Sequence, residues 1–202
     1  DTAYALDLLT DLPVPVVVTG AQRRLDEPSS DVPANLTLAV RTAADERFGP
    51  GVHVAFDNEV HAGRDAVKTH SNALSTMASP ASAPVATVTR STTRLLREPR
   101  RGVAREPLCV PDGPIDVSDP KAAEELVPAV PVIASGTGVS GAGIERALDA
   151  GVGGIVVEGT GLGNATGAIG DAIAEAVPRV PVVVAGRPVG PTEPVYGTPG
   201  GA

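Results

Sequence analysis

The sequence predicts an α/β protein: a partial N-terminal mixed β-sheet with helices, followed by a smaller parallel α/β C-terminal domain. Apolar, β-branched runs such as Val14–Val18 and Val52–Phe56 are typical of strands buried on both faces of a parallel sheet. A helical pattern lies between these two runs, and the order strand, helix, strand is a parallel crossover unit. The 23 Gly and 20 Pro residues fit the many short connections of such a fold.

Two helices are predicted in the first part of the chain. Residues 1–11 carry a partial helical stripe of apolar positions, which Leu12-Pro13 ends. A second helix is expected to start from a cap at Ser30 or Asp31 and to run to about Glu46. The predicted buried face of this helix consists of Leu36, Leu38, Ala39, Val40 and Ala43.

Shorter elements follow the second strand. The polar segment His61–Ser71 comes after Val52–Phe56 and is predicted to lie at the carboxyl end of that strand, where ligands collect in such sheets. Asn72–Ser79 is expected to form a short helix. Val85–Thr89 and Thr93–Arg97 alternate in polarity and are predicted to pair as a hairpin.

A linker and a second unit are predicted beyond the hairpin. Residues 98–120 are rich in Pro, Gly and Arg without any period, which indicates a connection rather than a helix or strand. We therefore expect an N-terminal domain at 1–105, a linker at 106–120 and a C-terminal domain at 121–202. The elements expected in the C-terminal domain are strands Val130–Ala134, Gly154–Val157 and Val180–Ala185 and helices Gly141–Ala150 and Ala168–Val177.

Composition excludes several classes of protein. The net charge of −8 comes from 24 acidic and 16 basic residues, which argues against nonspecific nucleic-acid binding, so no nucleic-acid partner is expected. Acid excess with few lysines also resembles the proteins of salt-loving, halophilic organisms. The single cysteine, Cys109, excludes an internal disulfide, and no H-E-x-x-H motif or other metal-ligand spacing occurs, so no metal is predicted.

Neither a membrane span nor a signal peptide is visible. No apolar run approaches the about 20 residues that a transmembrane helix needs, and no membrane partner is expected. The sequence opens on Asp1-Thr2-Ala3-Tyr4 as if inside a helix and stops on Gly200-Gly201-Ala202. We expect both ends to be truncations, and we expect a cytoplasmic location.

Lys68 is the first catalytic candidate. The chain has two lysines, Lys68 and Lys121, against fourteen arginines, so the use of lysine within the polar segment is unusual. Arginine cannot replace lysine where the cation must lose its proton. Asp65 lies three residues earlier and is the candidate supporting carboxylate. The alternative is a solvated lysine beside a solvated aspartate.

A dinucleotide site is a second hypothesis. Gly136–Gly141 matches G-x-G-x-x-G between a predicted strand and a predicted helix. Glu158 follows at about the distance of a ribose-binding acid. The unit lies late in the chain and lacks the further strands of a mononucleotide-binding half, so the alternative is a set of ordinary glycine turns.

Three further patterns carry weaker signals. Asp65, His70 and Ser71 form a Ser/His/acid set, but neighbouring residues of an extended segment point to opposite faces. Cys109 is a lone cysteine, a type that is more often inert than catalytic. The arginines between residues 90 and 105 are typical of a solvated hairpin and linker, with an RNA-binding patch as the alternative.

Five segments together resemble the bacterial-type L-asparaginase family. They occur in the family's order and span nearly the whole chain. The segments and the family patterns that they resemble are Asp1–Leu8 with E-[TS]-A-[YF]-x-L-x-L, Pro15–Arg23 with P-V-V-x-x-G-A-[MQ]-R, Ser30–Leu36 with S-[AS]-D-G-P-x-N-L, Gly63–Thr69 with x-R-D-[VA]-x-K-x and Gly153–Asn164 with G-[IV]-V-[LVI]-x-G-x-G-x-G-N.

The resemblance implies an amidohydrolase that hydrolyses L-asparagine, and in some members glutamine, through a threonine nucleophile and without a cofactor. It assigns proton transfer to Lys68, with Asp65 in support, and gives Ala21 a backbone contact to the substrate amide. Asn164 matches a residue that reaches a neighbouring subunit's site in some members, which work as dimers of dimers. The partners implied are a small-molecule substrate and further copies of the chain, as a dimer or tetramer.

The sequence departs from the family at important positions. The T-G-G-T and H-G-T-D motifs that carry the catalytic threonines do not occur, and the family's C-terminal helices are missing. Val32 stands where Gly is usual, and Arg24 stands where Pro is common. A relative of the family, the asparaginase-like component of archaeal glutamyl-tRNA amidotransferase, shares a similar G-A-Q-R turn and is the alternative function.

The missing threonine motifs predict that the polypeptide 1–202 is inactive alone. No residue in it matches the nucleophile, so asparagine is expected to release no ammonia above the uncatalysed background. An ammonia assay on the purified polypeptide checks this. Release at an ordinary enzymatic rate contradicts the prediction.

Overall fold

A computed structural model describes residues 1–9, 13–99, 128–190 and 192–193. The contacts divide the chain into two units, residues 1–114 and 115–202, each described by itself below. The predicted linker 106–120 and Cys109 lie outside the described residues.

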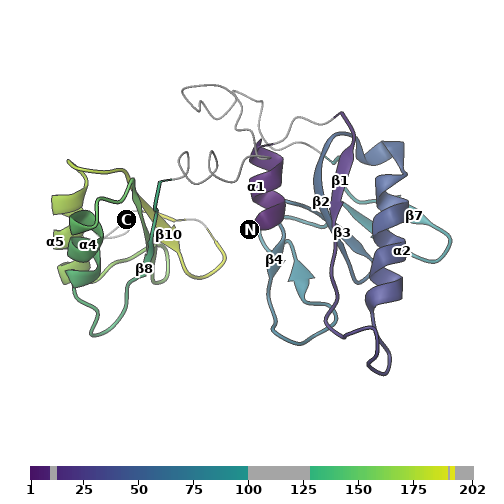
Figure 1. The fold of residues 1–202 in the computed structure, drawn as a ribbon, viewed down its shortest axis with the longest axis horizontal. Coiled ribbons are helices and arrows are strands. Elements are labelled where there is room, and N and C mark those ends of the chain that lie inside the picture. Colours follow the sequence, from purple (N-terminus) through teal and green to yellow (C-terminus); the bar gives the residue numbers. More distant parts are fainter. Residues whose placement is uncertain (10–12, 100–127, 191, 194–202) are drawn as a thin grey trace. The chain divides into compact units, whose positions relative to one another are not determined.

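The first unit is built on a mixed five-stranded sheet, as the sequence predicts (Figure 1). β1 (Pro15–Val18) pairs in parallel with β2 (Gly51–Phe56). The other neighbours are antiparallel: β2 pairs with β3 (Glu59–Ala62), β3 with β6 (Ala86–Val88), and β6 with β7 (Thr93–Leu95). The sequence identified β1, β2 and the β6–β7 hairpin but missed β3.

Two helices cover opposite faces of this sheet. Val52 and Val54 of β2 pack with Ala3 of α1 (Thr2–Leu9), whereas Ala55 joins the cluster that contains Leu38 and Ala39 of α2 (Val32–Ala43). Successive side chains of a strand point to opposite faces, so β2 binds one helix on each side. That arrangement explains why every residue of β2 is buried.

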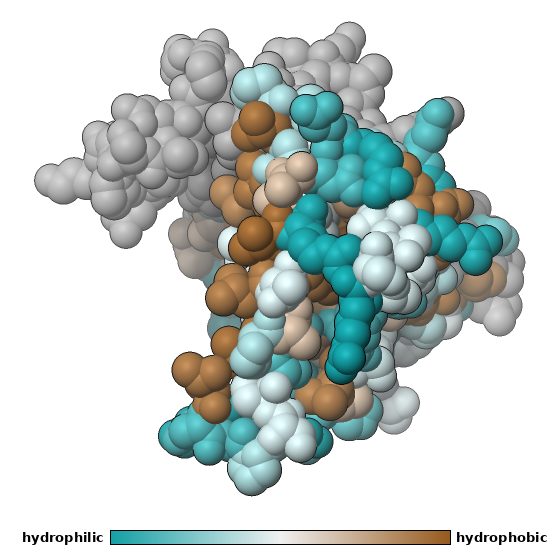
Figure 2. All heavy atoms as spheres, turned by 90° about the vertical axis from the view of Figure 1, so that its right-hand side faces the viewer, coloured by the Kyte–Doolittle hydropathy of each residue, from teal (hydrophilic) through white to brown (hydrophobic). Residues whose placement is uncertain are grey.

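The predicted buried face of α2 is wrong in part. Leu38 and Ala39 are buried, but Leu36 and Val40 are 56% and 61% exposed and Ala43 is exposed as well. Figure 2 views the molecule from the side of α2 and shows apolar side chains reaching the surface among polar ones. The remaining inward positions are the polar Asn35 and Thr42, which complete the helical spacing i, i+3, i+4, i+7.

The segment after β2 also differs from its prediction. Asp57 and Asn58 both have positive φ (45° and 65°), as a two-residue type I′ turn requires, and the chain reverses into β3. The Gly63 N–H then donates to the Val52 carbonyl, 2.7 Å away, at the amino end of β2. The sequence predicted this segment at the carboxyl end because the short turn lacks the glycine that usually signals a hairpin.

The predicted helix at 72–79 is also wrong. Met77–Ala78 form β5, which pairs with β4 (Val67–Lys68) in a separate two-stranded sheet. The N–H and hydroxyl of Thr69 both donate to the Thr76 carbonyl, at 2.8 and 3.0 Å. Such local side-chain bonds compete with helix formation.

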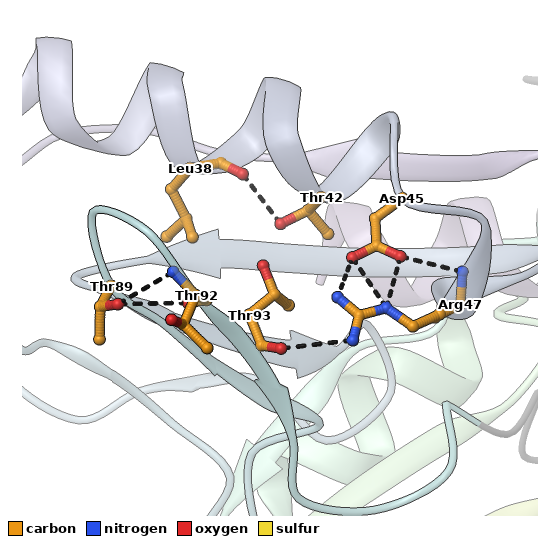
Figure 3. A network of polar contacts seen from close by, with 7 residues as sticks. All are labelled: Leu38, Thr42, Asp45, Arg47, Thr89, Thr92 and Thr93. Carbon is orange, nitrogen blue, oxygen red and sulfur yellow. Dashed lines mark hydrogen bonds and ion pairs between the residues drawn. The ribbon is translucent and has the colours of Figure 1, made fainter.

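Two arginines form hydrogen bonds that connect α2 and η1 to the β6–β7 hairpin. Arg41 of α2 donates to the Thr89 carbonyl at 2.6 Å. Arg47, in the 3₁₀ turn η1 (Glu46–Phe48), bonds the Asp45 carboxylate and the Thr93 carbonyl (Figure 3). The figure also shows the Thr42 hydroxyl donating to the Leu38 carbonyl, so the buried hydroxyl has its hydrogen-bond partner within the helix.

The second unit has the five predicted elements. Its sheet is all parallel in the order β10-β9-β8, and α4 and α5 pack on one face (Figure 1). The bounds are β8 Val132–Ala134, α4 Ala142–Asp149, β9 Ile155–Gly159, α5 Gly167–Ala176 and β10 Val182–Gly186. Among the helices of the described residues, none is long and apolar enough to cross a membrane.

Gly159, at the end of β9, is predicted to tolerate no side chain. A Cβ there would lie 2.4 Å from the carbonyl carbon of Gly163, and backbone cannot give way as a flexible side chain can. We expect Gly159→Ala to lower the free energy of unfolding by about 1–3 kcal/mol in urea titrations. Gly167→Ala is the control, since nothing lies within 4 Å of its Cβ. Equal effects of the two variants would contradict the prediction.

Candidate active site

The candidate site is the turn that follows β1, residues 19–24. Its backbone is held by the residue that precedes α2, because the N–H groups of Gln22 and Arg23 each donate to the Asp31 carboxylate at 2.9 Å. At the start of the turn, the Thr19 hydroxyl donates to the Ala55 carbonyl of β2 at 2.7 Å. The turn is therefore held by hydrogen bonds to Asp31 and to β2.

Asn35 joins three segments beneath this turn. Its side chain is buried, and its amide NH₂ donates to the Gly20 carbonyl at 2.9 Å and to Asp31 at 3.0 Å. Its amide oxygen accepts the Asp57 N–H from the β2–β3 turn, at 3.0 Å. One amide thus satisfies polar groups from the β1 turn, the start of α2 and the β2–β3 turn.

The Asp31 carboxylate is stabilised in its charged form. Partial loss of hydration by itself would raise the pKa of this carboxyl group. The N–H groups of Gln22, Arg23 and Asp31 itself, with the Asn35 amide, nevertheless hold the pKa of Asp31 below its ordinary value of 3.8. Asp31 does not cap α2 with its side chain, although the sequence predicts a cap there.

Lys68 reaches the same turn through Gln22. Its Nζ donates to the Gln22 side-chain oxygen at 3.0 Å, and Gln22 directly follows Ala21. The Gln22 amide nitrogen in turn donates to the carbonyl of Ala73 at 2.9 Å. The structure therefore brings Lys68 to the turn that contains Ala21, although the chain reaches that position by way of β3.

Asp65 is placed differently from its prediction. Its carboxylate accepts hydrogen bonds from Arg97 at 2.7 Å and from the Ser82 hydroxyl at 3.0 Å. Lys68 is exposed. In the described part of the chain, no hydrogen bond or ion pair joins Lys68 and Asp65, and Asp65 binds the segment after β7. The supporting role of Asp65 stays a prediction.

The Ser/His/acid set is engaged elsewhere. The Nδ1 atom of His70 accepts the backbone N–H groups of Asn72 and Ala73, at 3.0 and 2.9 Å. That ring nitrogen is thus occupied by its own loop, and the Asp65 carboxylate is occupied by Arg97 and Ser82. In the part of the chain that the structure describes, no group of three or more His, Cys, Asp or Glu residues is arranged to hold a metal.

The glycine motif at 136–141 has a packing explanation. It lies between β8 and α4, as predicted, but a Cβ at Gly141 would lie 2.7 Å from the Ala172 Cβ of α5. The carboxylate of Glu158, the predicted ribose ligand, forms an ion pair with Arg187, with 3.5 Å between Oε2 and Nε. Close contact between α4 and α5 accounts for Gly141 without a dinucleotide.

Asn164 ends a tight turn after β9. The N–H of Thr160 donates to the Asn164 carbonyl and the N–H of Asn164 donates back, both at 2.8 Å. Its side-chain oxygen is buried and has no hydrogen-bond partner among the described residues. The predicted intersubunit role of Asn164 stays a prediction.

Sequence reasoning missed Gln22, Asp31 and Asn35 as site residues. Each lies inside a segment that carries the family resemblance, so the signal was present. Asp31 was interpreted as a helix cap, and Asn35 was left out of the buried face because it is polar. The rule that would have identified Asn35 is that buried polar side chains occur where several groups need partners.

Comparisons with known proteins find one matching family and several similar proteins. A sequence profile of the family described as "Asparaginase, N-terminal" matches residues 1–101. The chain is 35% identical over 180 residues to a glutamyl-tRNA(Gln) amidotransferase component of Methanothermobacter thermautotrophicus, covering 87% of this chain and 39% of that protein. It is 34% identical over 185 residues to L-asparaginase 2 of Escherichia coli, covering 91% and 50%. It is 34% identical over 164 residues to the L-asparaginase of Thermococcus kodakarensis, covering 81% and 45%. The chain spans half or less of the length of these relatives.

The Asp31 network predicts a defined pH dependence of stability. Its pKa is lowered in the folded state, so its contribution is present above about pH 4 and is lost as the pH falls through the folded pKa. We expect Asp31→Asn to lower the free energy of unfolding at pH 7 by about 1–3 kcal/mol. Urea titrations should show this difference shrinking below about pH 4.

The control for this experiment is Asp26→Asn, because the Asp26 side chain forms only an exposed ion pair with Arg24 among the described residues. It is expected to change stability by less than about 0.5 kcal/mol. A loss in Asp31→Asn that stays constant from pH 7 to pH 2 would contradict the assignment.

Proposed function

The chain belongs to the asparaginase family, and we propose that it is part of an amidohydrolase that converts L-asparagine to L-aspartate and ammonia. The reaction adds water across the side-chain amide, in two stages. A threonine hydroxyl first displaces ammonia, and water then releases the acyl group. The threonine belongs to the motifs that this sequence does not contain, so this chain contributes substrate contacts and proton transfer.

The observation that carries the proposal is the bond between Lys68 and Gln22. It brings a lysine amine to the turn that contains Ala21, and these are the two positions to which the family resemblance assigns proton transfer and substrate contact. The Asp31 and Asn35 network holds that turn in place before any substrate arrives. Such fixed positioning is what lowers the cost of orienting reactants.

The role proposed for Lys68 is to hold and move a proton at Nζ. An amine can accept a proton from a hydroxyl nucleophile and return it to the leaving ammonia, which a guanidinium cannot do. Ala21 offers its backbone to the substrate amide. Gln22 positions Lys68 through its side-chain amide. The amide oxygen accepts the Lys68 bond, and the amide nitrogen donates to the carbonyls of Ser71 and Ala73.

A second candidate function is supply of ammonia within a glutamyl-tRNA amidotransferase. The similarity to the amidotransferase component is as high as the similarity to the L-asparaginases, which favours this candidate. The two functions differ in their dependence on a partner. A free asparaginase releases ammonia alone, whereas an amidotransferase component is expected to need its partner proteins and tRNA.

We further propose that the full-length protein is a homodimer or homotetramer and acts in the cytoplasm on a small-molecule substrate. The oligomer is supported by the family resemblance, in which Asn164 matches a residue that reaches a neighbouring subunit's site in some members. A halophilic source remains the proposal that accounts for the net charge of −8.

Substitution of Lys68 tests the proposed function. In the full-length protein, Lys68→Ala is expected to lower kcat for asparagine by about 100-fold or more, because proton transfer loses its amine. Lys68→Arg is expected to restore no activity, since its charge is permanent. Ammonia release under steady-state conditions is the measurement.

The matched control is Val67→Ala, a change at the exposed neighbour on β4, which should keep kcat within about twofold. Thermal unfolding should be similar for all three variants, because Lys68 is exposed. Turnover near the normal rate in Lys68→Ala would refute the catalytic role. Activity that appears only with added partner proteins and tRNA would favour the amidotransferase.

A further inference from the structure

A pocket of about 690 Å³ lies where three hairpins of the first unit meet. The β2–β3 turn forms one wall, the end of β6 with the following turn forms a second, and β5 with the residue Ser75 forms the third. The volume falls within the range of about 300–1,000 Å³ that is usual for small-molecule sites. Lys68, Ala21 and Gln22 are not among the lining residues.

The lining carries charges of opposite sign on different hairpins. Asp57 and Glu59 lie on the β2–β3 hairpin, and Arg90 lies on the β6–β7 turn. Among the described residues, neither the Asp57 carboxylate nor the Arg90 guanidinium takes part in an ion pair or a side-chain hydrogen bond. The pocket thus holds an anionic side and a cationic group that do not neutralise each other.

The Glu59 carboxylate is also without a cation. Nε2 of His61 lies 3.5 Å from this carboxylate, and the His61 ring is fully buried with Nδ1 bonded to the Ser79 hydroxyl at 2.9 Å. Burial, with the nearby charge of Arg97, lowers the pKa of His61 against the weaker pull of Asp65, so the ring is neutral at pH 7. Partial burial and the charge of Asp57 raise the pKa of Glu59. A positive group bound between the two carboxylates would relieve this repulsion.

Apolar atoms line the rest of the pocket. They come from Phe56 at the end of β2, from Met77 and Ala78 of β5, and from Val88 of β6. Thr87 and Thr89 lie on the same wall as Arg90, and the Thr89 hydroxyl is bonded to the Thr92 carbonyl at 3.4 Å. The lining therefore offers acceptors for an ammonium, donors for a carboxylate, and apolar surface for a short aliphatic chain.

We propose that this pocket binds a small zwitterion of the α-amino acid class. The ammonium lies against Asp57 and Glu59, the carboxylate pairs with Arg90, and the aliphatic side chain contacts Phe56 and Met77. Both charged ends of the ligand are needed, because each satisfies a group that the protein leaves unpaired. The site goes beyond the proposed amide hydrolysis, which uses the turn after β1.

Calorimetric titration of the 202-residue chain with L-norvaline tests the proposal, because this amino acid has a short apolar side chain and no amide to hydrolyse. Saturable binding is expected, with affinity lowered about tenfold or more in both Arg90→Gln and Glu59→Gln. n-Butylamine, which lacks the carboxylate, and valerate, which lacks the ammonium, are expected to bind at least tenfold more weakly.

Lys68→Ala is the control variant and should leave the affinity for norvaline unchanged. Loss of binding in that variant would assign norvaline to the turn after β1 and overturn the proposal. Absence of saturable binding in the unsubstituted chain, or equal binding of norvaline and n-butylamine, would overturn it as well. Circular dichroism spectra that match the unsubstituted chain establish that each variant is folded. If Glu59→Gln does not fold, Arg90→Gln supplies the test, because Arg90 lies at an exposed turn position.

Discussion

The buried amide of Asn35 is the interaction on which the candidate site depends. A polar group that is left without a partner away from water costs about 1–3 kcal/mol. Without the Asn35 amide, the Gly20 carbonyl and the Asp57 N–H would lose the partner that it supplies, and one oxygen of Asp31 would lose one of its two donors. Because Asp31 in turn holds the N–H groups of the turn after β1, the position of that turn is set by Asp31, directly before α2, and by Asn35 in its first turn.

Elements with a purely local signal could be predicted from the sequence. The strands and helices of the second unit have continuous β-branched runs, helical spacing and glycine boundaries, and all five were placed correctly. The buried face of α2 could not be placed from apolar residues alone, since it combines Leu38 and Ala39 with two hydrogen-bonded polar residues. The helix expected at 72–79 failed because hydrogen bonds of Thr69 and His70 fold that loop instead.

The candidate site could be predicted in its residue types but not in its pairs. Lys68 was identified because it is rare, and it does reach the turn of Ala21, through Gln22. Its expected partner Asp65 is bound by Arg97, 32 residues later in the chain. Sequence proximity favoured Asp65 with Lys68, but a guanidinium and a hydroxyl that arrive from the following hairpin satisfy the carboxylate more completely. No local pattern contains that information.

The turn Asp57-Asn58 connects the two sites by geometry. Because both residues adopt positive φ, the chain reverses after two residues and β3 returns along β2, which carries the Lys68 segment to its place. The same reversal leaves the side chains of Asp57 and Glu59 on the pocket, while the N–H of Asp57 is held by Asn35. One short turn therefore sets the path of the chain toward Lys68 and supplies the anionic wall of the pocket. A substitution that prevents positive φ at these two positions would disturb both sites at once.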